Sequence, residues 1–276
     1  MIREITDTTI LHNGVHMPWL GLGVYKVMEG EEVVQAVAAA LRHGYRSIDT
    51  ASLYQNEGGV GQGVRESGIN RNEVFITTKV WNTDQGYDKT LRAFEESRRK
   101  LDCGPLDLYL IHWPVKGKYR ETWRAMERLY EEGQTRAIGV SNFNIHHLKD
   151  LMQHSRIKPM VNQVEYHPRL TQKELHHFCR ENHIQLEAWS PLMRGRLLDH
   201  EVLTRIARIH GKTPAQIILR WDLQHGIVTI PKSVREDRIK ANADIFDFEL
   251  SQEEMTQIND LNRGQRVGQD PDNFHF

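Results

Sequence analysis

The stretch YRSIDTASLYQNE (45–57) begins as an apolar β-strand and carries polar, reactive groups where that strand ends. Asp49 closes the strand, and Tyr54 follows five residues later. In parallel α/β folds the reactive side chains lie at the carboxyl ends of the strands. This stretch therefore predicts a parallel sheet with a functional site at that edge.

Eight short apolar runs typical of β-strands recur along the chain. They lie at 20–24, 45–49, 74–80, 106–112, 135–141, 160–165, 185–190 and 227–232. Apolar residues at helical spacing separate most of them, for example Trp123, Met126 and Leu129. One strand and one helix every roughly 25 to 30 residues, over about 250 residues, is what a closed (β/α)₈ barrel requires. We predict an α/β protein with a single (β/α)₈ TIM barrel domain over residues 1–276.

Two flanking elements are also expected, and one competing fold is disfavoured. The Asn13-Gly14 pair predicts a β-hairpin with a type I′ turn at the bottom of the barrel. The segment 251–262 starts with a serine cap and predicts an extra C-terminal helix. An open doubly wound sheet would carry a GxGxxG loop after its first strand, and GGVGQG (58–63) has the wrong spacing.

Charge and cysteine content exclude several classes of function. With 36 basic and 37 acidic residues, the chain has no net attraction to nucleic acid or to an anionic membrane. Cys103 and Cys179 form no CxxC pair, so neither a disulfide framework nor a zinc ribbon is expected. The first residues do not resemble a signal peptide, and no apolar run reaches the length of a membrane span. We expect a cytoplasmic monomer that binds a small molecule.

Three consecutive predicted strands each end in a reactive side chain. These are Asp49, Lys79 and His112. Neighbouring strands lie ~4.8 Å apart, so the three groups should converge, with Tyr54 folded over them. An ammonium beside a phenol lowers its pKa from ~10, a carboxylate keeps that ammonium charged, and an imidazole can donate to an oxygen that gains negative charge. The set predicts a site that can donate a proton and stabilise an oxygen that gains negative charge, as when a carbonyl becomes an alkoxide.

Ordinary structural roles are the alternative for each residue taken singly. A strand-end Asp can cap a helix, and a Lys at a barrel mouth can extend its ammonium to water. Their joint position at one rim favours a catalytic role. A metal-dependent barrel hydrolase that uses His112, His167 and Asp49 is a second enzyme class, although the chain lacks an HExxH motif.

With these residues, the chain resembles the aldo-keto reductases from about Met17 to Asn262. The matching stretches are MPWLGLG, YRSIDTASLYQNE, TTKVWN, DLYLIHWP, GVSNF, NQVEYHP and IPKSVREDRIKAN. The resemblance implies a (β/α)₈ barrel, NADPH or NADP as cofactor, and Tyr54 as the general acid in carbonyl reduction. It assigns the other catalytic positions to Asp49, Lys79 and His112. The chain looks like the prokaryotic branch of the family that includes 2,5-diketo-D-gluconate reductases and glyoxal reductases.

The same resemblance assigns the binding residues. Those expected to contact the nicotinamide are Ser141, Asn142, Gln163 and Trp189. Those expected at the pyrophosphate, the 2′-phosphate and the adenine are Ser190, Leu192, Lys232, Ser233, Val234, Arg238 and Asn242. A Lys and an Arg at the end of the eighth strand and the start of the following helix suit a phosphate group. The substrate walls are expected to be Tyr25, Trp81 and Trp113, together with His112.

Several positions depart from the family pattern. Val24 and Tyr25 replace a threonine and a tryptophan, and Ala241 replaces a glutamate that binds adenine in many relatives. The loop after His112 and the tail 263–276 are short. We therefore expect an open pocket and a broad range of small carbonyl substrates. Some relatives bind the cofactor without catalysis, and the intact catalytic set argues against that alternative here.

Overall fold

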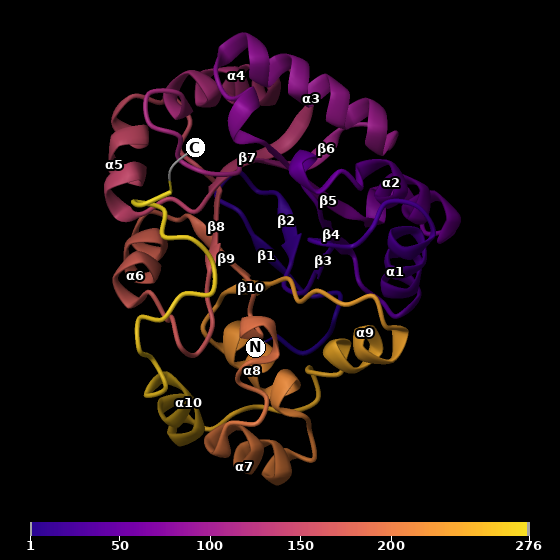
Figure 1. Ribbon diagram of the computed structural model, residues 1–276, viewed down its shortest axis with the longest axis vertical. Coiled ribbons are helices and arrows are strands. Elements are labelled where there is room, and N and C mark those ends of the chain that lie inside the picture. Colours follow the sequence, from indigo (N-terminus) through magenta and orange to yellow (C-terminus); the bar gives the residue numbers. More distant parts are fainter. Residues whose placement is uncertain (1, 275–276) are drawn as a thin grey trace.

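The computed structural model describes residues 2–274, and its centre is an eight-stranded parallel barrel (Figure 1). The strands are β3 (Leu22–Gly23), β4 (Ser47–Asp49), β5 (Phe75–Val80), β6 (Leu106–Ile111), β7 (Thr135–Ser141), β8 (Val161–Glu165), β9 (Gln185–Trp189) and β10 (Val228–Thr229). Each pairs with the next in chain order. Parallel bridges from Leu20 to Thr229 and from Gly23 to Lys232 join the first strand to the last. The predicted fold and all eight predicted strands are confirmed.

Helices surround the barrel (Figure 1). They are α1 (Glu31–Arg42), α2 (Glu57–Glu66), α3 (Tyr87–Leu101), α4 (Tyr119–Glu131), α5 (Ile145–Gln153), α6 (Lys173–Glu181), α7 (Glu201–His210), α8 (Pro214–Gln224), α9 (Glu236–Ala243) and α10 (Gln252–Asn259). Helix α4 buries Trp123, Met126 and Leu129, as its spacing predicts. The extra helix α10 is confirmed, and Ser251 and Glu254 form its capping box.

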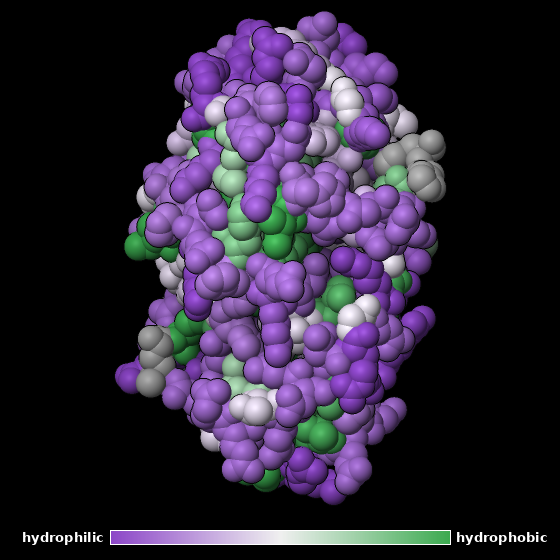
Figure 2. Space-filling view, turned by 90° about the vertical axis from the view of Figure 1, so that its left-hand side faces the viewer, coloured by the Kyte–Doolittle hydropathy of each residue, from purple (hydrophilic) through white to green (hydrophobic). Residues whose placement is uncertain are grey.

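The outward faces of the helices are polar. On the face in Figure 2, hydrophilic residues dominate and apolar residues form small separate patches. This distribution follows from helices that each bury one apolar stripe against the sheet. No helix among residues 2–274 combines the length and the apolar character that a membrane crossing requires.

Helix α2 is an element that the sequence did not predict, because glycine disfavours helices. Three glycines on it allow close packing against both neighbouring helices. A Cβ atom on Gly61 would lie 1.9 Å from the carbonyl oxygen of Leu101, the last residue of α3. On Gly63, a Cβ would lie 2.8 Å from the carbonyl oxygen of Val34 in α1. The glycines therefore permit a backbone approach that a side chain would block.

The predicted N-terminal hairpin is confirmed, but its turn is different. Strands β1 (Thr8–Ile10) and β2 (His16–Pro18) pair antiparallel. The side chain of Asn13 donates to the carbonyl of Arg136 in β7 at 3.0 Å, which places the hairpin at the amino-terminal end of the barrel. A type I′ turn needs positive φ at both central residues, and of the Asn-Gly pair only Gly14 has it, with φ 86°. The prediction of a type I′ turn is therefore wrong.

Candidate active site

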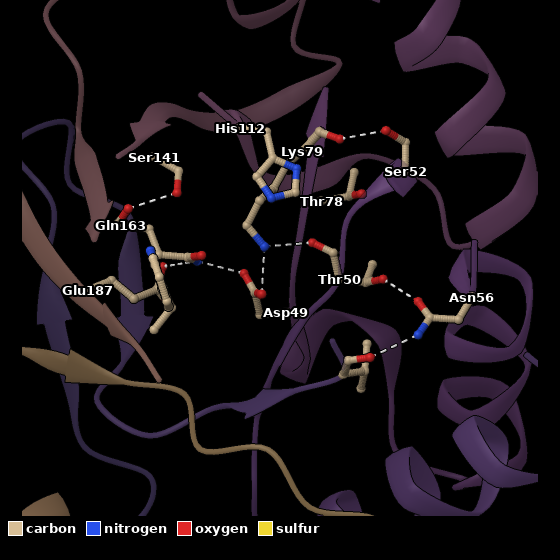
Figure 3. A network of polar contacts seen from close by, with 12 residues as sticks. Asp49, Thr50, Ser52, Asn56, Thr78, Lys79, His112, Ser141, Gln163 and Glu187 are labelled. Atoms are coloured by element: carbon tan, nitrogen blue, oxygen red, sulfur yellow. Dashed lines mark hydrogen bonds and ion pairs between the residues drawn. The ribbon is translucent and has the colours of Figure 1, made fainter. Parts of the chain in front are cut away.

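Three of the four predicted catalytic side chains, Asp49, Lys79 and His112, meet at the carboxyl end of the barrel (Figure 3). Asp49 is the last residue of β4, Lys79 lies near the end of β5, and His112 follows β6 directly. The Nζ atom of Lys79 donates to Oδ1 of Asp49 at 2.6 Å and to the carbonyl oxygen of Thr50 at 2.9 Å. Lys79 has no exposed surface, so this ion pair is buried within the barrel.

Tyr54 lies next to both the ammonium and the imidazole. Its ring centroid is 5.1 Å from Nζ of Lys79. It is 5.7 Å from the ring centroid of His112, and the two rings meet at 76°. The geometry that the sequence predicts for this set is therefore present: a phenol beside a paired ammonium, with an imidazole across from it.

The loop that carries Tyr54 is fixed by hydrogen bonds that the sequence analysis did not foresee. Ser52 donates from Oγ to the backbone carbonyl of Lys79 at 2.9 Å. Asn56 donates from Nδ2 to the carbonyl of Val24 at 3.0 Å and accepts from the Thr50 hydroxyl at 2.7 Å. Ser52, Asn56 and Thr50 all lie in the stretch 45–57, and their position in that motif was the one sequence feature that could have indicated this role. They hold the phenol in place on a loop.

Burial and charge act in opposite directions on Tyr54. Although part of its surface is open to solvent, burial raises the pKa of Tyr54 to about 12, while the charge of Lys79 lowers it and that of Asp49 raises it. The charge of Lys79 lowers the Tyr54 pKa, as the sequence analysis predicted. The net shift is upward, contrary to the sequence-based expectation, because burial outweighs the nearby ammonium.

The protonation states of the other two groups follow from the same balance. Burial lowers the pKa of Lys79, but the charges of Asp49 and Tyr54 raise it, and the net direction is upward. Burial, together with the charge of Lys79, holds the pKa of His112 well below its ordinary value. Lys79 is thus cationic and His112 neutral near pH 7, and a neutral imidazole keeps one N–H to donate.

Gln163 connects the ion pair to a carboxyl group that the sequence analysis missed. Its Nε2 donates to Oδ2 of Asp49 at 2.7 Å and to Oε2 of Glu187 at 2.8 Å (Figure 3). Burial, and secondarily the charge of Asp49, raise the pKa of Glu187 to about 8. Its only sequence signal was a carboxylate inside the apolar run QLEAWS (185–190).

The residues predicted to contact a nicotinamide lie together beside the catalytic set. Ser141 donates from Oγ to the backbone carbonyl of Gln163 at 2.7 Å. Asn142 donates from Nδ2 to the backbone carbonyl of His112 at 2.9 Å, and its Oδ1 accepts from Trp189 Nε1 at 2.9 Å. Asn142 adopts φ 65°, a left-handed conformation that asparagine tolerates better than most residues. The structure therefore brings all four predicted residues to one side of the mouth.

The residues predicted to contact the phosphates and the adenine follow β9 and β10. They are Ser190, Leu192, Lys232, Ser233, Val234, Arg238 and Asn242. Lys232 lies beside Gly23 of β3 at the barrel seam, and Arg238 lies in the first turn of α9. Both are exposed, and neither forms an ion pair within the described residues. Two exposed cations, one just after β10 and one in the first turn of a helix, fit a phosphate group.

Aromatic side chains border the mouth as predicted. Trp81 packs edge-on against His112 with centroids 5.0 Å apart, and the half-exposed Tyr25 lies 5.0 Å from Tyr54. Trp113 stacks on Phe274 with centroids 4.3 Å apart. The short tail thus returns to the mouth and adds an aromatic ring that the sequence analysis missed, since only folding places residue 274 there.

The residues proposed for a metal-dependent hydrolase do not assemble. His112, His167 and Asp49 form no group of converging ligand atoms within residues 2–274. His167 is buried and binds Oε1 of Glu165 through Nε2 at 2.9 Å. This alternative is therefore wrong.

One other group of possible metal ligands exists in the described part of the chain, namely His146, His147 and Asp272. The Nδ1 atom of His147 accepts the backbone N–H of Asn144 at 3.1 Å, within the capping box of α5. A neutral His147 then carries its proton on Nε2, the atom that faces Asp272 at 3.6 Å. The arrangement suits an imidazole donor to a carboxylate rather than a metal ligand.

Comparisons with known proteins agree with this geometry. The model of the aldo/keto reductase family matches residues 19–263. The glyoxal reductase of Bacillus subtilis (strain 168) is 63% identical over 276 residues, which cover 100% of both chains. The methylglyoxal reductase DkgA of Escherichia coli (strain K12) is 46% identical, with 96% of both chains covered. A crystal structure of a mutant of Gox0644 in complex with NADPH superposes with a TM-score of 0.93 at 44% identity, covering 98% of both chains. The chain therefore belongs to the aldo/keto reductase family and is an oxidoreductase.

Proposed function

We propose that this enzyme reduces small aldehydes, dicarbonyls or keto sugars to alcohols with NADPH, and that Tyr54 is the general acid. The observation that carries the proposal is the buried ion pair of Lys79 and Asp49 beside the phenol. Two of its relatives are named glyoxal reductase and methylglyoxal reductase, which supports small dicarbonyl substrates.

The residues present fit a phosphorylated dinucleotide. Lys232 and Arg238 are exposed cations free to bind the 2′-phosphate. Ser141 and Asn142 supply polar groups beside His112, where a nicotinamide would be held. When bound, NADPH supplies the hydride. The protein supplies position and charge.

The proton comes from the protein. The raised pKa keeps Tyr54 protonated at neutral pH, so its hydroxyl can give a proton to the substrate oxygen. Lys79 stays cationic and stabilises the phenolate that forms. The neutral His112 orients the carbonyl by donating one hydrogen bond to the same oxygen, as developing negative charge requires. In alcohol oxidation the Tyr54 phenolate is the base.

The test is Tyr54→Phe, assayed as NADPH consumption with methylglyoxal and a panel of keto sugars. We expect turnover to fall by about 10²- to 10⁴-fold, the usual contribution of a positioned general acid. NADPH binding, measured by fluorescence quenching, should stay within a factor of two. Tyr130→Phe is the matched control, because the Tyr130 hydroxyl accepts from Asn13 in the hairpin at the opposite end of the barrel.

Two outcomes would count against the proposal. Near-normal turnover of the Tyr54→Phe variant would remove the proton-donor role. If the wild-type protein binds NADPH but does not oxidise it with any of the carbonyl compounds tested, the result would instead favour the non-catalytic alternative.

A further inference from the structure

Glu187 is a buried acid with no role in the mechanism above. It lies in β9 directly opposite Gln163 of β8 in the parallel register. Its side chain shares the Gln163 amide with Asp49, a residue of β4. Because β4 and β9 are not neighbours in the sheet, the three side chains meet within the barrel. Glu187 has no exposed surface.

The two carboxyl groups determine how the Gln163 amide is oriented. Asp49 and Glu187 both face the same amide atom, and the Asp49 carboxylate, which is paired with Lys79, can only accept hydrogen bonds. That atom must therefore be the NH₂ group, and both of its hydrogens are used. The amide oxygen of Gln163 is the polar atom of this side chain that remains for a ligand. It can only accept.

We propose that Glu187 is a positioning residue that fixes the Gln163 amide with its oxygen available to accept from the carboxamide NH₂ of the nicotinamide. This inference rests on the proposed function, since it concerns the binding of the same cofactor. Asp49 alone supplies one acceptor, and the second acceptor prevents the amide from rotating about its terminal bond. The sequence-derived role of Gln163 then depends on a residue that does not touch the cofactor.

The charge of Glu187 gives a second effect by which its role can be tested, namely the relative affinity for NADP and NADPH. The charged groups that face it are Asp49 and Lys79, and Gln163 donates to it. With its pKa raised to about 8, it is mostly neutral at pH 7 and acquires a negative charge near pH 8 to 9. Oxidised nicotinamide carries a positive ring charge that the reduced ring lacks. Ionised Glu187 therefore favours NADP over NADPH.

The experiment compares wild type, Glu187→Met and Glu187→Gln for binding of NADPH and NADH by fluorescence quenching. Met removes the acceptor at similar volume, whereas Gln keeps an acceptor oxygen. We expect Glu187→Met to weaken NADPH and NADH binding by the same factor, about 5- to 10-fold, because the Gln163 amide loses one of the two hydrogen bonds that hold it in position. Glu187→Gln should bind within a factor of two of wild type. Thermal unfolding of each variant verifies folding.

A second arm does not depend on the Met variant being folded. The ratio of NADPH to NADP dissociation constants is measured in wild type and Glu187→Gln between pH 7 and pH 9. In wild type this ratio should increase as the pH rises, because NADP binding becomes tighter relative to NADPH binding. In Glu187→Gln the ratio should stay constant.

Each result separates the two proposals. A folded Glu187→Met that binds both cofactors as wild type does, a Glu187→Gln as weak as Glu187→Met, or a pH shift that survives in Glu187→Gln overturns the role of Glu187. Wild type that binds neither NADPH nor NADP overturns the proposed function instead.

Discussion

At the residue scale, the site depends on one buried ion pair. Lys79 is fully buried and Asp49 nearly so, at 2% exposure. Removing two charges from water costs several kcal/mol per ion, which the pair recovers only with good geometry and further hydrogen bonds. Here Thr50 and Gln163 supply those bonds. In the proposed function the pair acts on the phenol, and its desolvation cost leaves no clear gain in stability.

Lys79→Met tests this view of the pair. It leaves the Asp49 carboxylate buried without a cation, so we expect a loss of about 3 to 5 kcal/mol in the free energy of unfolding. Adding Asp49→Asn removes the unpaired charge and should restore a large part of that stability without restoring turnover. Urea unfolding at pH 7 measures both. A double variant no more stable than the single one would show that charge pairing is not the cause.

At the element scale, helix α2 depends on glycine for its position rather than for its flexibility. Gly61 has almost no space above its Cα atom, since the backbone of Leu101 lies there. Gly58, on the same helix, would place a Cβ 2.8 Å from the end of the Glu29 side chain, which can move. The two positions therefore respond differently to the same substitution.

Gly61→Ala should destabilise the enzyme by about 3 kcal/mol, because overpacking against a backbone atom forces α2 away from α3. Gly58→Ala is the matched control, and we expect it to be neutral or to stabilise by up to about 1 kcal/mol, the gain in helix propensity. Chemical denaturation of both variants is the measurement. Equal effects at the two sites would mean that close packing does not explain the glycines.

At the scale of the whole molecule, the barrel contains buried acids that resist ionisation. Glu187 lies inside the sheet, and Asp222 of α8 accepts from the hydroxyl of Thr229 at 2.8 Å. Burial raises the pKa of Asp222 well above its ordinary value. A folded pKa above the unfolded one, ~4, means that the native state binds more protons than the unfolded state at intermediate pH. Each acid therefore contributes stability at low pH that is lost as the pH rises.

We expect the free energy of unfolding to decrease between pH 7 and pH 8, where few histidines still titrate. Asp222→Asn keeps an acceptor for Thr229 and cannot ionise, so its free energy of unfolding should decrease less than that of wild type as the pH rises. Urea unfolding at both pH values measures the difference. The same pH dependence in variant and wild type would show that Asp222 does not carry it.

The sequence by itself determined the barrel and the meeting of the predicted catalytic side chains. Apolar strand runs and their spacing specify eight parallel strands, and the ends of such strands converge in any closed barrel. Asp49, Lys79 and His112 could therefore be placed together from their positions alone. The family resemblance supplied the residues predicted to contact the nicotinamide, and the structure brings these residues together.

Only the tertiary structure decided features that depend on what faces a residue across space. The glycines of α2 gave no helical signal in the sequence, because their role is to let α2 pack closely against α1 and α3. Glu187 was one polar residue in an apolar run until folding set it opposite Gln163. The direction of the Tyr54 pKa shift likewise depends on how far burial outweighs the charge of Lys79. Local pattern fixes strands and their ends, whereas desolvation and close contact arise only when distant segments pack.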